Sequence, residues 1–78
     1  MKEWSTMKKV KISTDYITLG QLLKYLNLAS SGGEVKHILA NHHILINSEH
    51  DQRRGRKIYP GYTVEIESLG SYRIIDED

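Results

Sequence analysis

Four cations lie within five residues in the segment from Arg53 to Lys57, in a chain whose formal net charge is only +1. Arginine presents a planar fork of N–H donors that can hold two oxygens of one phosphate, so Arg53, Arg54 and Arg56 suit a polyanion. Gly55 is expected to let the backbone turn so that these cations converge. Because a single-sign cluster repels itself when it is unpaired, the run indicates a nucleic-acid contact. The alternative is a solubilising hairpin loop.

A second place for an anion is Ser31-Gly32-Gly33-Glu34, which has the pattern of a helix start closed by a capping box. Backbone N–H groups in the first turn have no partner within the helix, and the helix dipole attracts negative charge there. Gly32 and Gly33 leave those groups uncovered, and Lys36 lies one turn further along and can extend the patch. Glu34 competes, since its carboxylate can occupy part of the site. The alternative is a tight turn between two helices that needs glycine flexibility.

Two aromatic side chains come shortly after the basic run. Tyr59 and Tyr62 flank a Pro-Gly turn at residues 60–61. Such rings can stack on unpaired bases of an RNA. The alternative is that both tyrosines pack over a small sheet with their hydroxyls in water.

The four histidines do not have the spacing of a zinc site, and the chain has no cysteine and no His-Glu-x-x-His motif. They are His37, His42, His43 and His50. His42 continues the apolar stripe of a predicted helix, so we expect it to be partly buried and hydrogen-bonded. No nucleophile elbow, P-loop or dinucleotide fingerprint is present. The sequence therefore predicts a binding module with no catalytic residues, no metal and no cofactor.

Hydrophobic spacing and capping signals indicate the elements that position these residues. Alternation over 8–13 predicts a short strand. Thr18 and Gln21 have the pattern of a capping box at the start of a first helix. Apolar stripes follow in both helices, at Leu19, Leu22, Leu23 and Leu26, then at Val35, Ile38, Leu39 and His42. The first helix is expected to stop at Asn27. Strands are expected at 43–46, 57–59, 62–67 and 71–75, with turns at 47–51 and 68–70. This order predicts an α+β fold with a packed pair of helices.

Length and charge set further limits. Seventy-eight residues make one domain, 1–78, in which residues 1–7 are expected to be a flexible terminus. No apolar stretch is long enough to span a bilayer, and with no signal segment and no cysteine we expect a cytoplasmic protein. Residues 65–78 carry five acids and one base, a balance of −4, so residues 1–64 carry +5. This segregation is typical of polyanion binders, although ordinary surface charge with an acidic tail would give the same values.

With these pieces in order, the chain resembles the S-four RNA-binding domain, named after the fourth protein of the small ribosomal subunit. The resemblance covers residues 17–66. The matching pieces are 17–23, 30–33, 35–39, 44–47, 53–58, Gly61 and 64–66. The Ser-Gly-Gly and Arg-Arg-Gly-Arg-Lys pieces are most similar to the free-standing YaaA-type members, which consist of this domain and little else.

The resemblance implies a fold and a site. The fold is the αL motif, two packed helices on a small, mostly antiparallel sheet. The start of the second helix and the following loop would bind structured RNA. The RNA-binding residues carried over are Ser31, Gly32, Gly33, Lys36, Arg53, Arg54, Arg56 and Lys57.

This chain departs from the family pattern at three places. Many members have arginine where this chain has Gly32, Asn-Gly where it has Asn47-Ser48, and Gly-Asp where it has Gly61-Tyr62. Without that arginine, its phosphate contact must be made by backbone amides or by Lys36.

The main hypothesis is a non-enzymatic monomer that grips ribosomal or transfer RNA through phosphate contacts. Two alternatives remain open. One is a protein-interaction adaptor whose basic face docks an acidic replication or ribosome-assembly factor. The other is duplex DNA binding by the same patch, because phosphate contacts carry no base information.

Overall fold

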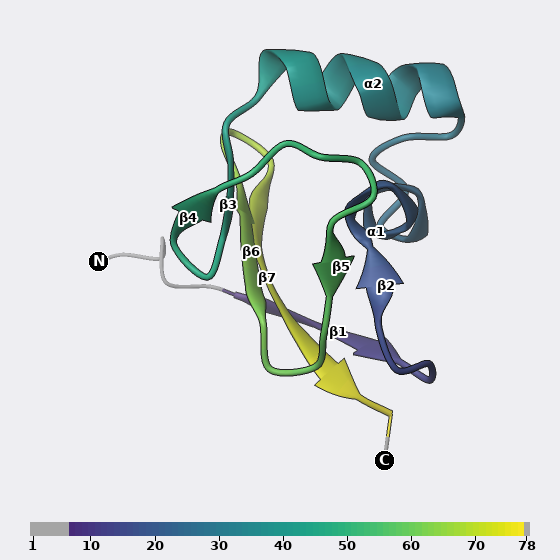
Figure 1. Cartoon of the computed structure of the whole chain (residues 1–78), viewed down its shortest axis with the longest axis vertical. Helices are drawn as coiled ribbons and strands as arrows, with labels where there is room; N and C mark the ends of the chain where they lie inside the picture. The colour runs from purple at the N-terminus through teal and green to yellow at the C-terminus, as the bar shows by residue number, and fades with distance from the viewer. Residues whose placement is uncertain (1–6, 78) are drawn as a thin grey trace.

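The computed structural model describes residues 7–77, which form two helices and seven strands. The elements are β1 Lys8–Ile12, β2 Ile17–Thr18, α1 Leu19–Tyr25, α2 Gly32–Asn41, β3 Ile44–Ile46, β4 Glu49–His50, β5 Lys57–Ile58, β6 Thr63–Ile66 and β7 Gly70–Asp76. Figure 1 shows α2 running across one end of the long strands, with α1 beside β2. The predicted flexible terminus at 1–7 lies, apart from Met7, outside the described residues. Within residues 7–77, no helix combines the length and the apolar character needed to cross a bilayer.

Five strands form the main sheet, in the order β1-β7-β6-β3-β4. The β1 and β7 strands pair in parallel, and the other pairs are antiparallel. The predicted α+β class, with two helices on a mostly antiparallel sheet, is therefore confirmed. One part of the strand prediction is wrong. Residues 47–51 were expected to be a turn throughout, but Glu49 and His50 pair with β3, and only Asn47 and Ser48 turn the chain, with φ of 53° and 71°.

The first helix begins as its capping box predicts. Thr18 Oγ1 accepts a hydrogen bond from the Gln21 amide at 3.2 Å, and Gln21 Oε1 accepts one from the Thr18 amide at 3.0 Å. The helix ends at Tyr25, and Asn27 then adopts a left-handed φ of 62°, a conformation that asparagine tolerates well. The predicted end of the first helix near Asn27 is confirmed.

The second helix starts at the expected serine but with a different bond pattern. Ser31 Oγ accepts a hydrogen bond from the Glu34 amide at 3.2 Å. The Glu34 carboxylate, however, accepts from the amide and hydroxyl of Ser30, at 2.6 and 2.8 Å, and not from Ser31. The predicted reciprocal box is therefore displaced by one residue. His42 ends the helix partly buried, and its Nδ1 lies 3.0 Å from the Glu67 carbonyl oxygen, as expected for a hydrogen-bonded histidine at the edge of the core.

The core lies between the helices and one face of the main sheet. Burial removes apolar surface from water, which is the main stabilising term for so small a chain. Most of the predicted helix stripes and the alternating strand positions are buried, at Leu19, Leu22, Leu23, Val35, Ile38, Leu39, Val10, Ile12, Val64 and Ile66, whereas Leu26 and His42 are only partly buried. Ala29, Ile44, Ile46, Ile58, Tyr72 and Ile74 complete the core.

A second, two-stranded sheet connects the basic segment to the first helix. Ile17 and Thr18 pair with Ile58 and Lys57. The sequence did not predict this pairing, because two residues are too few to show the alternation of a strand. Ile58 is fully buried, so the chain on both sides of it is held against the core. This small sheet fixes where the basic run stands relative to α1.

Candidate nucleic-acid interface

The segment Asp51–Lys57 has little regular structure, yet it is tied to both helices. The amides of Leu19 and Gly20, at the start of α1, donate to the carbonyl oxygens of Arg56 and Arg54 at 2.8 and 2.9 Å. Gln52 Nε2 donates to the carbonyl oxygens of Leu39 and His42 at the end of α2. The basic loop, residues 51–57, is therefore held in one shape by backbone groups that the helix ends leave without partners.

An aspartate at the base of the loop pairs with two of its arginines. Asp51 Oδ2 lies 2.8 Å from Arg53 Nη2 and 2.7 Å from Arg56 Nη1, and Asp51 Oδ1 also accepts from the Arg53 amide at 2.9 Å. The Asp51 side chain is only 9% exposed, whereas the Arg53 side chain is 75% exposed. Hydrogen bonds, first from Arg53 and then from Arg56, hold the pKa of the Asp51 carboxyl well below its usual range. The same pairing raises the pKa of Arg53.

Asp51 was missed in the sequence, where it was assigned only to a turn. Its signal is an acid two residues before the run of cations. Because Asp51 pairs with both Arg53 and Arg56, it relieves part of the repulsion within the run, although one acid against four cations still leaves residues 51–57 with a net charge of +3. The chain turns at Arg54 and Gly55 as expected, with the Arg56 amide donating to the Arg53 carbonyl oxygen at 3.1 Å, although Gly55 does not adopt a positive φ there.

Arg54 joins the loop to the start of α2. Its Cγ lies 2.6 Å from where a Cβ at Gly20 would stand. Arg54 therefore packs on α1 in space that is open only because residue 20 is a glycine. Its Nη1 reaches to 3.8 Å from the corresponding position at Gly32. The two predicted anion-seeking segments therefore meet through one guanidinium. Within residues 7–77, Arg54 has no ion pair with an acid, whereas Arg53 and Arg56 both pair with Asp51.

Two lysines border Arg54. One hollow beside it is also lined by Gly32 and Lys24, and another by Lys36 and Leu39. The predicted extension of the patch by Lys36 thus has a structural basis, since Lys36 and Arg54 line the same hollow. Lys24 was not among the predicted residues; it lies on the exposed face of α1, for which the sequence offered no partner.

The start of α2 has the expected glycines in its first turn, Gly32 and Gly33, with Ser31 as the cap. Glu34 does not cover their amides with its carboxylate, which is bound to Ser30. These bonds to Ser30, with a smaller contribution from the charge of His37, lower the pKa of Glu34. The Glu34 carboxylate was expected to compete with an anion for the amides of the first turn, but it is bound to Ser30, the residue before the cap.

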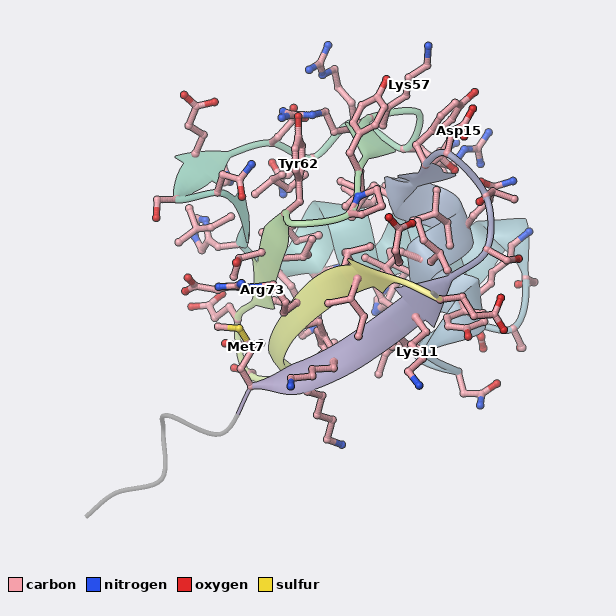
Figure 2. All side chains as sticks on the ribbon, turned by 90° about the horizontal axis from the view of Figure 1, so that it is seen from below. Met7, Lys11, Asp15, Lys57, Tyr62 and Arg73 are labelled. Carbon is pink, nitrogen blue, oxygen red and sulfur yellow. The ribbon has the colours of Figure 1, made fainter. Side chains whose placement is uncertain are left out.

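On the other side of the loop, cations and aromatic rings form one hollow, lined by Arg53, Gly55, Arg56, Lys57, Tyr59 and Tyr62. Lys57 Nζ stands 5.1 Å from the centre of the Tyr16 ring. The Tyr16 ring lies 5.6 Å from the Tyr59 ring, which lies 5.7 Å from the Tyr62 ring. In Figure 2, Lys57 projects at the same side of the molecule as Asp15, next to β2. Tyr16 belongs to this cluster only through the β2–β5 pairing, so its position in the sequence did not reveal it.

The histidines were considered as metal ligands in the sequence. Within the described chain, no group of three or more His, Cys, Asp or Glu side chains could hold a metal ion. His43 and His50 lie on neighbouring strands with ring centres 5.3 Å apart, and the Asn41 side-chain amide lies 3.2 Å from His37 Nδ1.

Within the described residues, the chain after β7 bonds to β1. The Glu77 amide donates to the Ile12 carbonyl oxygen at 3.0 Å, directly after β7 ends at Asp76. Among residues 7–77, the side-chain ion pairs of the loop are made by Asp51.

Comparison with known proteins gives two matches. The family model described as "S4 domain" matches residues 10–75, a longer stretch than the 17–66 of the resemblance. The chain is also 48% identical over 67 residues to a curated Bacillus subtilis (strain 168) protein named "Probable ribosome maturation protein RlbA". That alignment covers 86% of this chain and 94% of the relative.

Proposed function

Because this chain belongs to the S4 domain family, we propose that it is a non-catalytic RNA-binding protein that grips structured RNA through phosphate contacts, with ribosomal RNA as its ligand. The ligand class is supported by the relative, whose name assigns it to ribosome maturation. A role in that process would place the protein in the cytoplasm.

The observation that carries the proposal is the meeting of the basic loop with the start of α2 at Arg54. A rigid loop loses little conformational entropy on binding, so cations held in place bind more tightly than the same cations on a mobile segment. Arg54 and Lys57 make no ion pair with an acid in the described structure, and they line hollows on the two sides of the loop. Arg53 and Arg56 supply further N–H donors while Asp51 sets their direction.

The other predicted residues take supporting roles in this proposal. Ser31 would hold the first turn of α2 so that the amides of Gly32 and Gly33 face one further phosphate. Arg54, rather than Lys36 alone, would replace the family's arginine at position 32, because its guanidinium already reaches Gly32. Tyr59 and Tyr62 would stack on a base beside the phosphates, with Tyr59 the more accessible ring.

The test is a binding series with a folded ribosomal RNA fragment, a transfer RNA and duplex DNA across increasing salt. With four or five phosphates neutralised, log affinity should fall with log salt at a slope on the order of −3 to −4. A variant with alanine at Arg53, Arg54, Arg56 and Lys57 should lose most of that slope. The matched control carries alanine at Lys8, Lys9, Lys11 and Arg73, which removes four cations from β1 and β7, and should retain it.

The same series separates the alternatives. Equal binding of RNA and duplex DNA favours a general phosphate binder. A flat salt response with no loss in the loop variant contradicts the RNA grip. In that event, a partner protein retained after nuclease treatment would favour the adaptor hypothesis.

A further inference from the structure

A hollow beside the basic loop has no role in the phosphate grip proposed above. It is open, has a volume of about 950 Å³, and is lined by Thr14, Asp15, Tyr16, Ile17, Gln21, Lys24 and Tyr25. That volume is within the range of sites that hold small organic ligands. Two tyrosine rings are exposed in it, Tyr16 at 38% and Tyr25 at 58%.

Both rings are held in position although they are exposed. The Tyr25 hydroxyl donates a hydrogen bond to the Lys11 carbonyl oxygen at 3.1 Å. Tyr16 contacts the Tyr59 ring and lies beneath the Lys57 ammonium. Fixed aromatic faces in water lose little freedom when a planar ligand stacks on them. Tyr16 and Tyr25 are therefore suited to stack on a planar ligand, because their rings are both exposed and held in position.

The hollow is continuous with the phosphate-binding side of the loop. Gln21 and Lys24 line it and also line the adjoining hollow that contains Gly32 and Arg54. Lys24 and Arg54 lie where the two hollows meet, whereas Asp15 lines the first hollow together with the tyrosines, and Lys57 Nζ stands over the Tyr16 ring. This polarity suits a ligand with a phosphate at one end and an aromatic ring at the other.

We propose that this hollow binds one unpaired base of the RNA, stacked on Tyr16 or Tyr25, while the phosphate of that nucleotide lies between Lys24 and Arg54. The inference rests on the proposed function, since it presupposes that the loop grips RNA. Unpaired bases in loops and bulges are the part of an RNA that proteins read by aromatic stacking. Asp15, which can only accept hydrogen bonds when ionised, favours a base that offers an amino group, such as cytosine, over uracil.

The experiment uses two RNA hairpins that differ by one nucleotide. One has a fully paired stem, and the other has the same stem with a single bulged 2-aminopurine, whose fluorescence falls when it stacks. The protein is expected to bind the bulged hairpin at least about fivefold more tightly, with a fall in fluorescence. Tyr25→Leu should reduce that preference while leaving affinity for the paired hairpin within about twofold, and Tyr16→Leu should also reduce the preference. Tyr25→Phe keeps the ring and should keep the preference.

A second variant tests the site without disturbing its rings. With cytosine or uracil in the bulge, the wild-type protein should prefer cytosine, and Asp15→Asn should lose that preference. Equal binding of paired and bulged hairpins by the wild-type protein, with no change in fluorescence, would overturn the base site and leave the phosphate grip intact. Failure of the wild-type protein to bind either hairpin would instead contradict the proposed function.

Discussion

Two regions of this molecule carry four cations each and present them differently. In the basic loop, Arg53, Arg54 and Arg56 lie on an irregular segment tied to α1 and α2, and Lys57 follows as the first residue of β5. On the sheet, Lys8, Lys9, Lys11 and Arg73 lie on β1 and β7, with Lys9 directly opposite Arg73. Figure 2 shows Lys57 and Lys11 projecting at opposite edges of the molecule.

The loop has an internal acid, whereas the strand pair has like charges side by side. Asp51 pairs with two loop arginines and aims them, which makes the loop a shaped set of donors. Like charges opposite each other across two strands destabilise the pairing slightly, and their long side chains remain free to move apart. The two regions carry the same number of cations, but only the loop is expected to bind RNA specifically, because only there do the cations converge.

The largest expected effect comes from loosening the helices that carry the loop. Leu23→Ala or Ile38→Ala should lower the free energy of unfolding by about 2–5 kcal/mol, because each side chain is buried between the helices and the sheet. Urea unfolding followed by circular dichroism measures this. Leu69→Ala, at an exposed position, is the control and should change stability by less than about 0.5 kcal/mol. Comparable losses in all three variants would show that the core assignment is wrong.

A direct test of the comparison removes two cations from each region. Arg54→Ala with Lys57→Ala leaves the Asp51 pairs intact and should weaken RNA binding by about tenfold or more, since each lost phosphate contact also lowers the salt slope by about one. Lys9→Ala with Arg73→Ala removes the same charge from the strands and should weaken binding by about twofold or less. Fluorescence anisotropy with a labelled ribosomal RNA fragment measures both. Equal losses would indicate that only net charge matters.

Asp51→Asn tests whether the internal acid organises the loop. Because the folded pKa of Asp51 is lowered, its contribution to stability is present above the ordinary aspartate pKa of about 4 and is lost as the pH falls toward the lowered value. The variant should therefore melt at a lower temperature than the wild type at pH 7, and the difference should narrow below about pH 4. A difference in melting temperature that is constant from pH 7 to pH 3 would contradict this role for Asp51.

A smaller effect is expected from two glycines that differ in what surrounds them. Gly20→Ala places a methyl group against Arg54 Cγ and beside the Arg54 carbonyl oxygen, so it should shift that residue and weaken RNA binding by about two- to fivefold. Gly55→Ala, where nothing lies within 4 Å, should leave binding unchanged. The same anisotropy assay compares them. A larger effect at Gly55 than at Gly20 would contradict the placement of Arg54.

Local patterns predicted most of the elements. The Thr18 capping box and the leucine stripe of α1 involve contacts within one turn or between neighbouring turns, so they are readable from the sequence. The strand at Glu49 and His50 was missed because a two-residue strand has no measurable alternation and depends on β3 for its bonds. The second half of the α2 cap was misplaced because Ser30 and Ser31 are equivalent in pattern, and only the chain's path selects which of them Glu34 reaches.

The sequence by itself determined the α+β class, the two helix starts and the concentration of cations at residues 53–57, because each depends on residues close together along the chain. Tertiary structure decided that Asp51 holds Arg53 and Arg56, that Arg54 crosses Gly20 to reach Gly32, and that Tyr16 joins Tyr59. The Arg54 and Tyr16 contacts depend on how β2 pairs with β5 and how the loop returns to α1, which are long-range bonds. Asp51 is near its partners in sequence, but the direction of its side chain follows from the shape that those bonds impose on the loop.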